Sequence, residues 1–209
     1  HERLTRAVQN IGGIGNVTLL HADGRVSGFD TGPGNCLMDL WVREHQDEPY
    51  DEDGQLAASG DVDARLLDLL LQEPYFALPP PKSTGRELFN RAWLQKKLDQ
   101  QAAAVADVQA TLCEFTAATI ASAIAGAGLA PSQLLVCGGG AFNGELMRRL
   151  AARMPGVPVR HTGTAGIPPE QVEAALCAWL AHQFITGRPG NLVSVTGARG
   201  PRVLGALHR

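Results

Sequence analysis

Three glycine-rich segments are the places where this chain could bind phosphate. They span residues 10–16, 29–35 and 137–143, and each follows an apolar stretch typical of a strand. Backbone without a Cβ atom can approach a phosphate closely, and its exposed N–H groups can bind the phosphate oxygens. One such loop can equally be a structural turn. Three in 209 residues favour a nucleotide, but none is a Walker loop or a G-x-G-x-x-G fingerprint, so P-loop and dinucleotide chemistry are not supported.

Asp30 is the ionisable residue whose position is most informative. It sits one position past an apolar strand and directly before a turn. A carboxylate there can point into a cleft at the carboxyl end of the strand and accept a proton from water or a hydroxyl. From residue type alone, the favoured alternative is a turn aspartate that bonds the N–H of Gly32 or caps the following helix.

Residues 82–87 combine cations and hydroxyls directly after three prolines. The apolar spacing predicts a helix over 86–98, which places Arg86 where the helix dipole opposes its charge. Its planar donor fork could bind a carboxylate or a hydroxyl-rich ligand. A surface ion pair with Glu87 or with an acidic loop residue is the more ordinary alternative.

Other charged groups carry weaker signals. Glu170 and Glu173 fall in the first turn of a helix predicted over 168–185, where acids are favoured by the helix dipole alone. Carboxylates between residues 46 and 60 lack the EF-hand order, so a solvated loop is expected rather than a calcium site. No metal held by protein side chains is expected, because the histidines lack ligand spacing. The carboxylates are Asp47, Glu48, Asp51, Glu52 and Asp53, and the histidines that follow His1 are His21, His45, His161, His182 and His208.

The elements that must position these groups form an α/β pattern. Strands are predicted around residues 7–20 and 26–29, joined by an Asp-Gly turn, and again at 134–137 and, more weakly, 157–159. Helices are predicted from residue 37, over 62–71 and 86–98, over the Ala-rich stretch 102–127, from 143, and over 168–185. The tail 187–209 has no clear period.

Composition limits the class of protein. A chain that is 44% hydrophobic with net charge −3 can build a core, and it gives no electrostatic reason to expect nucleic acid or anionic membrane as a partner. No run of about 18 uninterrupted apolar residues predicts a membrane span, and no signal peptide is recognised. The cysteines are scattered in apolar or glycine-rich settings without a C-x-x-C pair, which predicts a reduced, cytoplasmic protein.

Taken together, the motifs resemble the anhydro-N-acetylmuramic acid kinase family. The resemblance runs in order from about Ala7 to His208. It rests on Asn-Ile-Gly-Gly-Ile-Gly-Asn at 10–16, Gly-Phe-Asp-Thr-Gly-Pro-Gly-Asn at 28–35, Lys-Ser-Thr-Gly-Arg-Glu at 82–87, Phe89-Asn90, residues 107–112, Cys-Gly-Gly-Gly-Ala-Phe-Asn at 137–143, and residues 169–174, 189–192 and 195–198.

The resemblance implies a fold and a reaction. The family belongs to the sugar kinase, heat-shock ATPase and actin superfamily, in which two ribonuclease-H-like lobes close on ATP and Mg²⁺. Its members open the 1,6-anhydro ring of anhydro-N-acetylmuramic acid with water and phosphorylate O6, which gives N-acetylmuramic acid 6-phosphate for cell-wall recycling. The resemblance also suggests a homodimer in the full-length form.

The same resemblance assigns roles to residues. It implies that Asp30 activates the attacking water and that Glu173 assists it. Nucleotide contacts would come from the first and third glycine-rich segments, residues 10–16 and 137–143. Sugar contacts would come from the second glycine-rich segment, residues 29–35, and from the basic segment, residues 82–87. The nucleotide residues are Gly12, Gly13, Gly15, Asn16, Gly138, Gly139, Gly140 and Asn143, and the sugar residues are Thr31, Gly32, Asn35 and Arg86.

One feature of the family is missing from the sequence. Family members begin with a lobe that carries a G-T-S-x-D-G phosphate loop, and no such segment occurs here. The chain is therefore expected to be the carboxyl-terminal portion of a two-lobed kinase. Residues 1–60 would carry the phosphate and catalytic segment, 61–130 a helical substrate-side segment, and 131–209 the adenosine-binding segment. The alternative function is a catalytically incomplete fragment that binds nucleotide or a partner.

Overall fold

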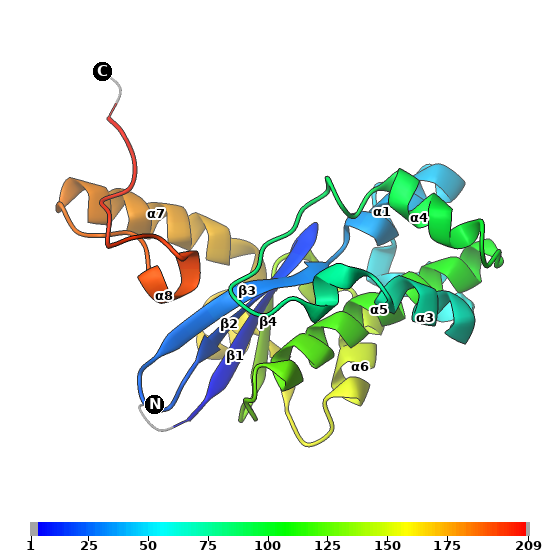
Figure 1. The fold of residues 1–209 in the computed structure, drawn as a ribbon, viewed down its shortest axis with the longest axis horizontal. Helices are drawn as coiled ribbons and strands as arrows, with labels where there is room; N and C mark the ends of the chain where they lie inside the picture. The colour runs from blue at the N-terminus through cyan, green and yellow to red at the C-terminus, as the bar shows by residue number, and fades with distance from the viewer. Residues whose placement is uncertain (1–3, 208–209) are drawn as a thin grey trace.

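A mixed five-stranded sheet forms the centre of the molecule in the computed structural model, which describes residues 4–207 (Figure 1). The strand order is β3-β2-β1-β4-β5, with antiparallel pairing of β1 with β2 and β2 with β3, and parallel pairing of β4 with β1 and β5. His208, which ends the sequence resemblance, lies outside the described residues. The strands are β1 (Arg6–Ile11), β2 (Ile14–Leu20), β3 (Val26–Pro33), β4 (Leu134–Cys137) and β5 (Val159–His161).

Most of the helices follow the predicted pattern. They are α1 (Cys36–Gln46), α2 (Gln55–Ser59), α3 (Ala64–Leu71), α4 (Arg91–Leu98), α5 (Val105–Gly126), α6 (Gly144–Arg153), α7 (Val172–Ile185) and α8 (Val193–Thr196). The predicted start of the helix over 86–98 is wrong. Asn90 caps α4 by accepting a hydrogen bond from the Trp93 amide at 3.0 Å, so α4 begins at Arg91 and Arg86 is not at a helix N-terminus.

Helix α5 is the core of the domain and packs across one face of the sheet (Figure 1). Leu112, Phe115 and Ile120 on this helix are fully buried. The helix is long and apolar enough to cross a membrane, yet 72% of its most apolar window is buried inside the protein. Its apolar length therefore reflects its central place in the core.

The strands alternate between two faces. Ala7 and Ile11 on β1, and Val17 on β2, point into the core beneath α5, whereas Val8 and Asn16 point to the other side and are half-buried. We call this second side the open face of the sheet. It is the face on which the predicted catalytic carboxylate lies.

Two sequence-based expectations differ from the structure. Residues 46–60 do not form only a solvated loop, because α2 forms within them and Asp51 is buried. Cys177 is exposed on α7, although the cysteines were expected to behave as small buried hydrophobes. The other three, Cys36, Cys113 and Cys137, are buried as expected.

Candidate active site

The three glycine-rich segments meet at one edge of the sheet. β1, β3 and β4 all end there and β2 begins there, which brings residues 12–13, 34–35 and 138–140 together. The Asn35 amide donates to the Gly12 carbonyl at 2.8 Å, and the Gly34 and Cys36 amides both donate to the Gly13 carbonyl, at 3.0 and 3.1 Å. The turn between β1 and β2 is thereby joined to the start of α1.

Close packing explains why glycine stands at two of these positions. A Cβ atom on Gly34 would collide with the Gly12 carbonyl oxygen. Gly138 has a φ of 79°, in the left-handed region, and a Cβ atom there would collide with the side-chain oxygen of Asn10. Glycine therefore stands at these positions because the loops approach one another too closely for a side chain.

A cavity of about 360 Å³ opens beside this edge, within the size range of small-molecule sites. One wall is the start of α1, the second is the acidic loop before α2, and the third is the short turn that follows β4. The lining combines amide and carboxylate groups with two exposed aromatic rings. The residues are Asn35, Met38, Asp39, Tyr50, Asp51, Asp53, Gly139, Phe142 and Asn143.

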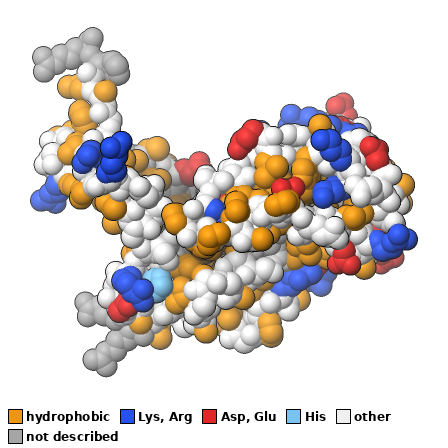
Figure 2. All heavy atoms as spheres, in the orientation of Figure 1, with side chains coloured by type: hydrophobic (Ala, Val, Ile, Leu, Met, Phe, Trp, Pro, Cys, Tyr) orange, Lys and Arg blue, Asp and Glu red, His pale blue; other side chains and the backbone are white. Residues whose placement is uncertain are grey.

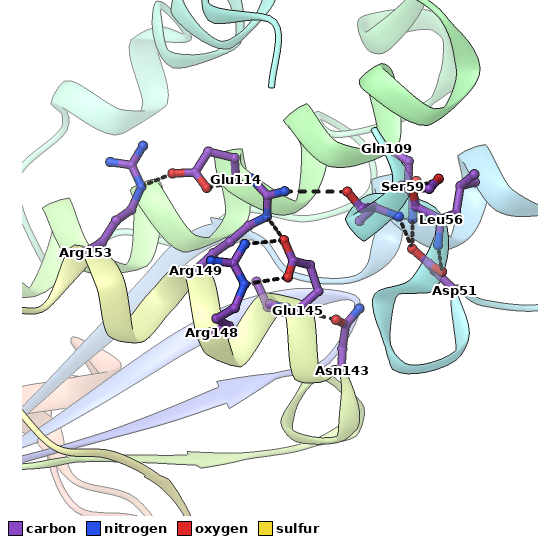
Figure 3. Close-up of polar contacts among 12 residues, drawn as sticks. Asp51, Leu56, Ser59, Gln109, Glu114, Asn143, Glu145, Arg148, Arg149 and Arg153 are labelled. Carbon is purple, nitrogen blue, oxygen red and sulfur yellow. Dashed lines mark hydrogen bonds and ion pairs between the residues drawn. The ribbon is translucent and has the colours of Figure 1, made fainter. Parts of the chain in front are cut away.

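The acidic loop is held in place by buried hydrogen bonds. The Asp51 carboxylate accepts from the amides of Leu56 and Ala57 at 2.8 and 2.9 Å, and from Gln109 Nε2 on α5 at 3.1 Å (Figure 3). Asp53 Oδ1 accepts from the Gly144 amide at the start of α6 at 2.9 Å. These two carboxylates are structural anchors for the cavity wall, which corrects the expectation of a fully solvated loop.

The third wall is braced by ion pairs between α5 and α6 (Figure 3). Arg149 lies 3.0 Å from Glu114 on α5 and 2.7 Å from Glu145 on its own helix, and all three side chains are largely buried. Hydrogen bonds from Arg148, together with the charge of Arg149, lower the pKa of Glu145 against the opposing effect of burial. The network fixes the helix whose N-cap is Asn143, where the side chain accepts from the Leu146 amide at 2.9 Å.

Asp30 lies on the open face, where it is the cross-strand partner of Asn16. Its Oδ2 atom accepts from Ser83 Oγ at 2.8 Å and from the Thr84 amide at 3.0 Å. Its own amide donates to the Lys82 carbonyl at 3.1 Å. The interpretation of Asp30 as a turn or capping residue is therefore wrong, because its carboxylate instead binds a segment from a distant part of the chain.

Arg86 reaches the turn between β1 and β2. Its Nη2 atom lies 2.9 Å from the point where a Cβ of Gly13 would stand, so a side chain at Gly13 would displace the guanidinium. The ion pair suggested with Glu87 is not among those formed by residues 4–207. The structure thus brings the basic segment and the first glycine-rich segment together.

Asp39 is a site residue that the sequence reasoning missed. It lines both the cavity and a neighbouring depression that also contains Arg43 and Arg86. Burial raises the pKa of its carboxyl to about 6, against the opposing effect of the two arginines. In the sequence, Asp39 is indistinguishable from the acids that commonly occupy a first helical turn.

Several predicted residues lie behind the site. Thr31 is buried, and its Oγ1 accepts from Gln9 Nε2 at 3.2 Å. Gly15 packs against both of these side chains, and Gly32 packs against Phe76. These residues shape the sheet beneath the open face, and their side-chain positions face the core.

Glu173 lies in the first turn of α7 and is exposed. Burial, with a smaller contribution from the Glu173 charge, raises the pKa of the Cys137 thiol at the end of β4. The Gly138 amide donates to the Pro169 carbonyl at 3.3 Å, which joins the turn before α7, four residues before Glu173, to the edge where the glycine loops meet. Within residues 4–207, no hydrogen bond or ion pair joins it to Asp30.

Comparison with solved structures supports the fold. The activator of the 2-hydroxyisocaproyl-CoA dehydratase from Clostridium difficile, solved with bound ADPNP, aligns with a TM-score of 0.52 at 15% identity, over 80% of this chain and 56% of that one. At this identity the likeness concerns the fold alone. It agrees with the predicted α/β fold of an actin-like ATPase lobe.

Sequence comparison is more specific. The chain matches the family described as anhydro-N-acetylmuramic acid kinase over residues 1–209. Anhydro-N-acetylmuramic acid kinases from Xanthomonas campestris pv. campestris (strain 8004) and Cupriavidus pinatubonensis are 55% and 53% identical, each over 97% of this chain. The match covers 54% and 55% of those proteins, so the chain spans about half the length of the curated relatives it matches. The chain belongs to the anhydro-N-acetylmuramic acid kinase family.

Proposed function

We propose that this chain supplies the catalytic carboxylate and part of the nucleotide site of an ATP-dependent anhydro-N-acetylmuramic acid kinase. The observation that carries the proposal is the placement of Asp30. It lies on the open face of the sheet whose edge gathers the glycine loops, and the Lys-Ser-Thr-Gly-Arg-Glu segment holds it by two hydrogen bonds. The proposed nucleotide, base and sugar contacts would thereby be grouped around one sheet.

The residues at the sheet edge fit a nucleotide. A Cβ atom on Gly12 or Gly139 would meet its nearest neighbour at 3.7 or 3.5 Å, which is an ordinary van der Waals distance, and Gly139 is exposed where it lines the cavity. Among residues 4–207, the buried side-chain oxygen of Asn10 beside Gly138 has no hydrogen-bond partner. Exposed backbone donors beside a cavity with amide and aromatic groups suit a phosphate chain and an attached base.

Magnesium would accompany the nucleotide. Residues 4–207 contain no group of three side chains arranged to hold a metal. In phosphoryl transfer, Mg²⁺ keeps several waters and is bound by the substrate phosphates with one or two carboxylates. When bound, it neutralises charge on the transferring phosphoryl group.

On the sugar side, Asp30 would act as the general base. Water attacks C1 of the anhydro sugar while its proton passes to the Asp30 carboxylate, the bond from C1 to the bridging oxygen breaks, and that oxygen, now O6, takes the γ-phosphoryl group from ATP. Asn16 lies beside Asp30 on the open face, and within residues 4–207 the buried Thr84 hydroxyl has no hydrogen-bond partner. Both groups could position the sugar or the water. Arg86, beside Gly13, and Glu173, at the start of α7, would contribute from the end of the sheet where the glycine loops meet.

The test uses a chimera in which residues 1–209 replace the matching segment of the Xanthomonas campestris relative. Asp30→Asn in this chimera should lower kcat at least about 100-fold, in line with loss of a general base, and leave the Kd for ATP within about threefold. Asp68→Asn is the control, because Asp68 is exposed on α3. Turnover close to that of the unmodified chimera in the Asp30 variant would overturn the assignment.

A second candidate function is nucleotide binding without catalysis by these 209 residues, which span about half the length of the curated relatives. Isothermal titration of residues 1–209 with ATP and Mg²⁺ separates the possibilities. Binding without turnover supports the nucleotide-binding function, and turnover supports the kinase. The absence of both would assign this chain a structural part in a larger enzyme. Cytoplasmic location, cell-wall recycling and a homodimer of the longer protein belong to the same proposal.

A further inference from the structure

A second cavity lies on the other side of β3 from the Asp30 carboxylate. Its volume is about 560 Å³, and it runs between the segment 76–82 and the carboxyl-terminal half of α5. Phe29 and Thr31 of β3 line it, and because side chains alternate along a strand, the intervening Asp30 side chain faces away from it. We call this cavity the α5 groove. None of the described residues lines both this groove and the cavity at the glycine loops.

The walls of the α5 groove are mainly apolar. Phe76 and Leu78 lie on one side of it, and Ala123 and Gly126 lie on the other. Leu78 is 52% exposed, and hydrophobic side chains are visible across the middle of the molecule, where Figure 1 places β3 and α5 (Figure 2). Sites for small molecules have this size and combine apolar walls with a few polar groups.

Lys82 is the charged residue among those described in the lining of the groove. Its Nζ atom donates to the carbonyls of Tyr75 and Phe76 at 3.3 and 3.2 Å, and it lies 4.7 Å from the ring centre of Tyr75. None of the ion pairs formed by residues 4–207 includes Lys82. Burial lowers the pKa of this ammonium group, as expected for a cation whose charge no carboxylate offsets.

The chemistry of this ammonium group limits what could pair with it. An ammonium group has three N–H donors, and the carbonyls of Tyr75 and Phe76 accept two of them. The remaining donor and the positive charge suit one anionic oxygen. A phosphate dianion is usually bound by arginine or by several N–H groups, so a single lysine would leave most of its charge unpaired. A carboxylate with one negative charge matches the groove better.

We propose that the α5 groove binds an amphipathic monocarboxylate, with the carboxylate paired to Lys82 and the apolar chain lying between α5 and the segment 76–82. The head group would supply the counter-ion that Lys82 does not have among the described residues, and the chain would bury apolar surface that is now open to water. The proposal concerns a second ligand site, so it does not depend on the reaction proposed above.

Isothermal titration of residues 1–209 with octanoate tests the proposal. We expect one octanoate to bind per chain. Octan-1-ol has the chain without the charge, and acetate has the charge without the chain, so each should have a Kd at least about tenfold higher than that of octanoate. The absence of saturable octanoate binding would overturn the proposal. An equal Kd for octan-1-ol would also overturn it, because the charge of Lys82 would then play no part.

A substitution on α5 locates the site without altering Lys82. A Cβ atom on Gly126 would meet no atom within 4 Å, so the side chain of Gly126→Leu can enter the groove without displacing the protein. We expect this variant to raise the Kd for octanoate at least about tenfold. Ala125→Leu is the matched control, because Ala125 is the exposed neighbour on the same helix and is not among the lining residues. Unchanged affinity in Gly126→Leu would contradict the location.

Substitutions of Lys82 test the head-group contact. Lys82→Met should raise the Kd for octanoate at least about tenfold, whereas Lys82→Arg, which keeps the charge, should change it less than about threefold. Lys97→Met is the matched control, because Lys97 is also half-buried and its Nζ atom lies 5.6 Å from the ring centre of Trp93 on α4. An unchanged Kd in a folded Lys82→Met variant would contradict the pairing. If this variant does not fold, the comparison of octanoate with octan-1-ol decides the role of the charge.

Two other occupants of the groove would give different results. If a second copy of the chain fills it, sedimentation velocity will show a dimer that increases with protein concentration and dissociates in octanoate. If part of the longer protein fills it, octanoate will bind residues 1–209 but will not bind the folded chimera with the Xanthomonas campestris relative. Either result would overturn the proposal, and a monomeric chain and a chimera that both bind octanoate would support it.

Discussion

The Asp30 carboxylate accepts a hydrogen bond from Ser83 Oγ at 2.8 Å, across 53 positions in the sequence. The neighbouring Thr84 amide binds the same oxygen at 3.0 Å. Two motifs that appear separate in the sequence therefore form one unit, in which the 82–84 segment orients the carboxylate. As the proposed general base, Asp30 would have to be held in a defined direction to act on a bound water, and these two hydrogen bonds would supply that restraint.

Loss of the Ser83 hydroxyl should impair turnover more than binding. In the chimera, Ser83→Ala should lower kcat about 10-fold, because the carboxylate loses one of two restraints, while the KM for ATP changes less than about twofold. Steady-state kinetics measure both. Ser59→Ala is the control, since Ser59 Oγ is exposed and, among the described residues, bonds the Leu56 carbonyl on α2. An unchanged kcat in Ser83→Ala would show that the hydrogen bond has no role in the reaction.

Gly138 and Gly156 offer a matched pair for separating backbone strain from collision. Both have φ near 80°, but a Cβ at Gly138 would collide with Asn10, and a Cβ at Gly156 would meet no atom within 4 Å. Gly156→Ala should lower the free energy of unfolding by about 1 kcal/mol, because an alanine at this position would have to adopt a left-handed backbone conformation. Gly138→Ala should cost at least about 1 kcal/mol more, measured by urea unfolding. Equal losses would mean that the loop relaxes around the new methyl group.

Asp39 should make stability depend on pH in the opposite sense to most carboxyls. Burial raises the pKa of the Asp39 carboxyl from 3.8 to about 6, so the folded state holds this proton more tightly than the unfolded state does. The contribution of Asp39 to the free energy of unfolding therefore declines as the pH rises from about 4 to 6. The carboxyl keeps some solvent contact, which reduces the expected effect to about 1–2 kcal/mol. Asp39→Asn should remove this decline and stabilise the protein at pH 7. Thermal unfolding between pH 4 and 8 tests this, and a variant whose pH dependence matches that of the unmodified protein would contradict it.

Asp51 should contribute to both stability and the shape of the cavity. Asp51→Ala removes three hydrogen bonds and leaves Gln109 Nε2 buried without an acceptor, so we expect a loss of about 2–4 kcal/mol in urea unfolding. Glu48→Ala, an exposed neighbour in the same loop, should change stability by less than about 0.5 kcal/mol. A small effect of Asp51→Ala would show that the loop is held mainly by packing.

The sequence predicts an element correctly where its residue types have one dominant structural cause. The turn around Asp23 and Gly24, the apolar periodicity of α5, and the glycine spacing all predicted elements that the structure contains. Asp30 was predicted to lie just past a strand and before a turn, but it lies inside β3, which continues to Pro33. Its partners were not predicted either, because a hydrogen bond to Ser83 depends on tertiary contacts that local propensity does not contain. Asp39 and Asp51 were missed for the same reason. A carboxylate in a loop or first helical turn has the same local signature whether it is solvated or buried.

The hydrogen bonds between the β1–β2 turn and the start of α1 give that turn an electrical polarity. The carbonyl oxygens of Gly12 and Gly13 are both occupied by amides of residues 34–36. Their lone pairs are directed into the protein and do not face an approaching ligand, so an anion meets little repulsion from the backbone there. The Arg86 guanidinium beside Gly13 adds positive charge in the same place. If the turn contacts the nucleotide as proposed, this arrangement would favour a negatively charged group over a positively charged one before any contact specific to one ligand is made.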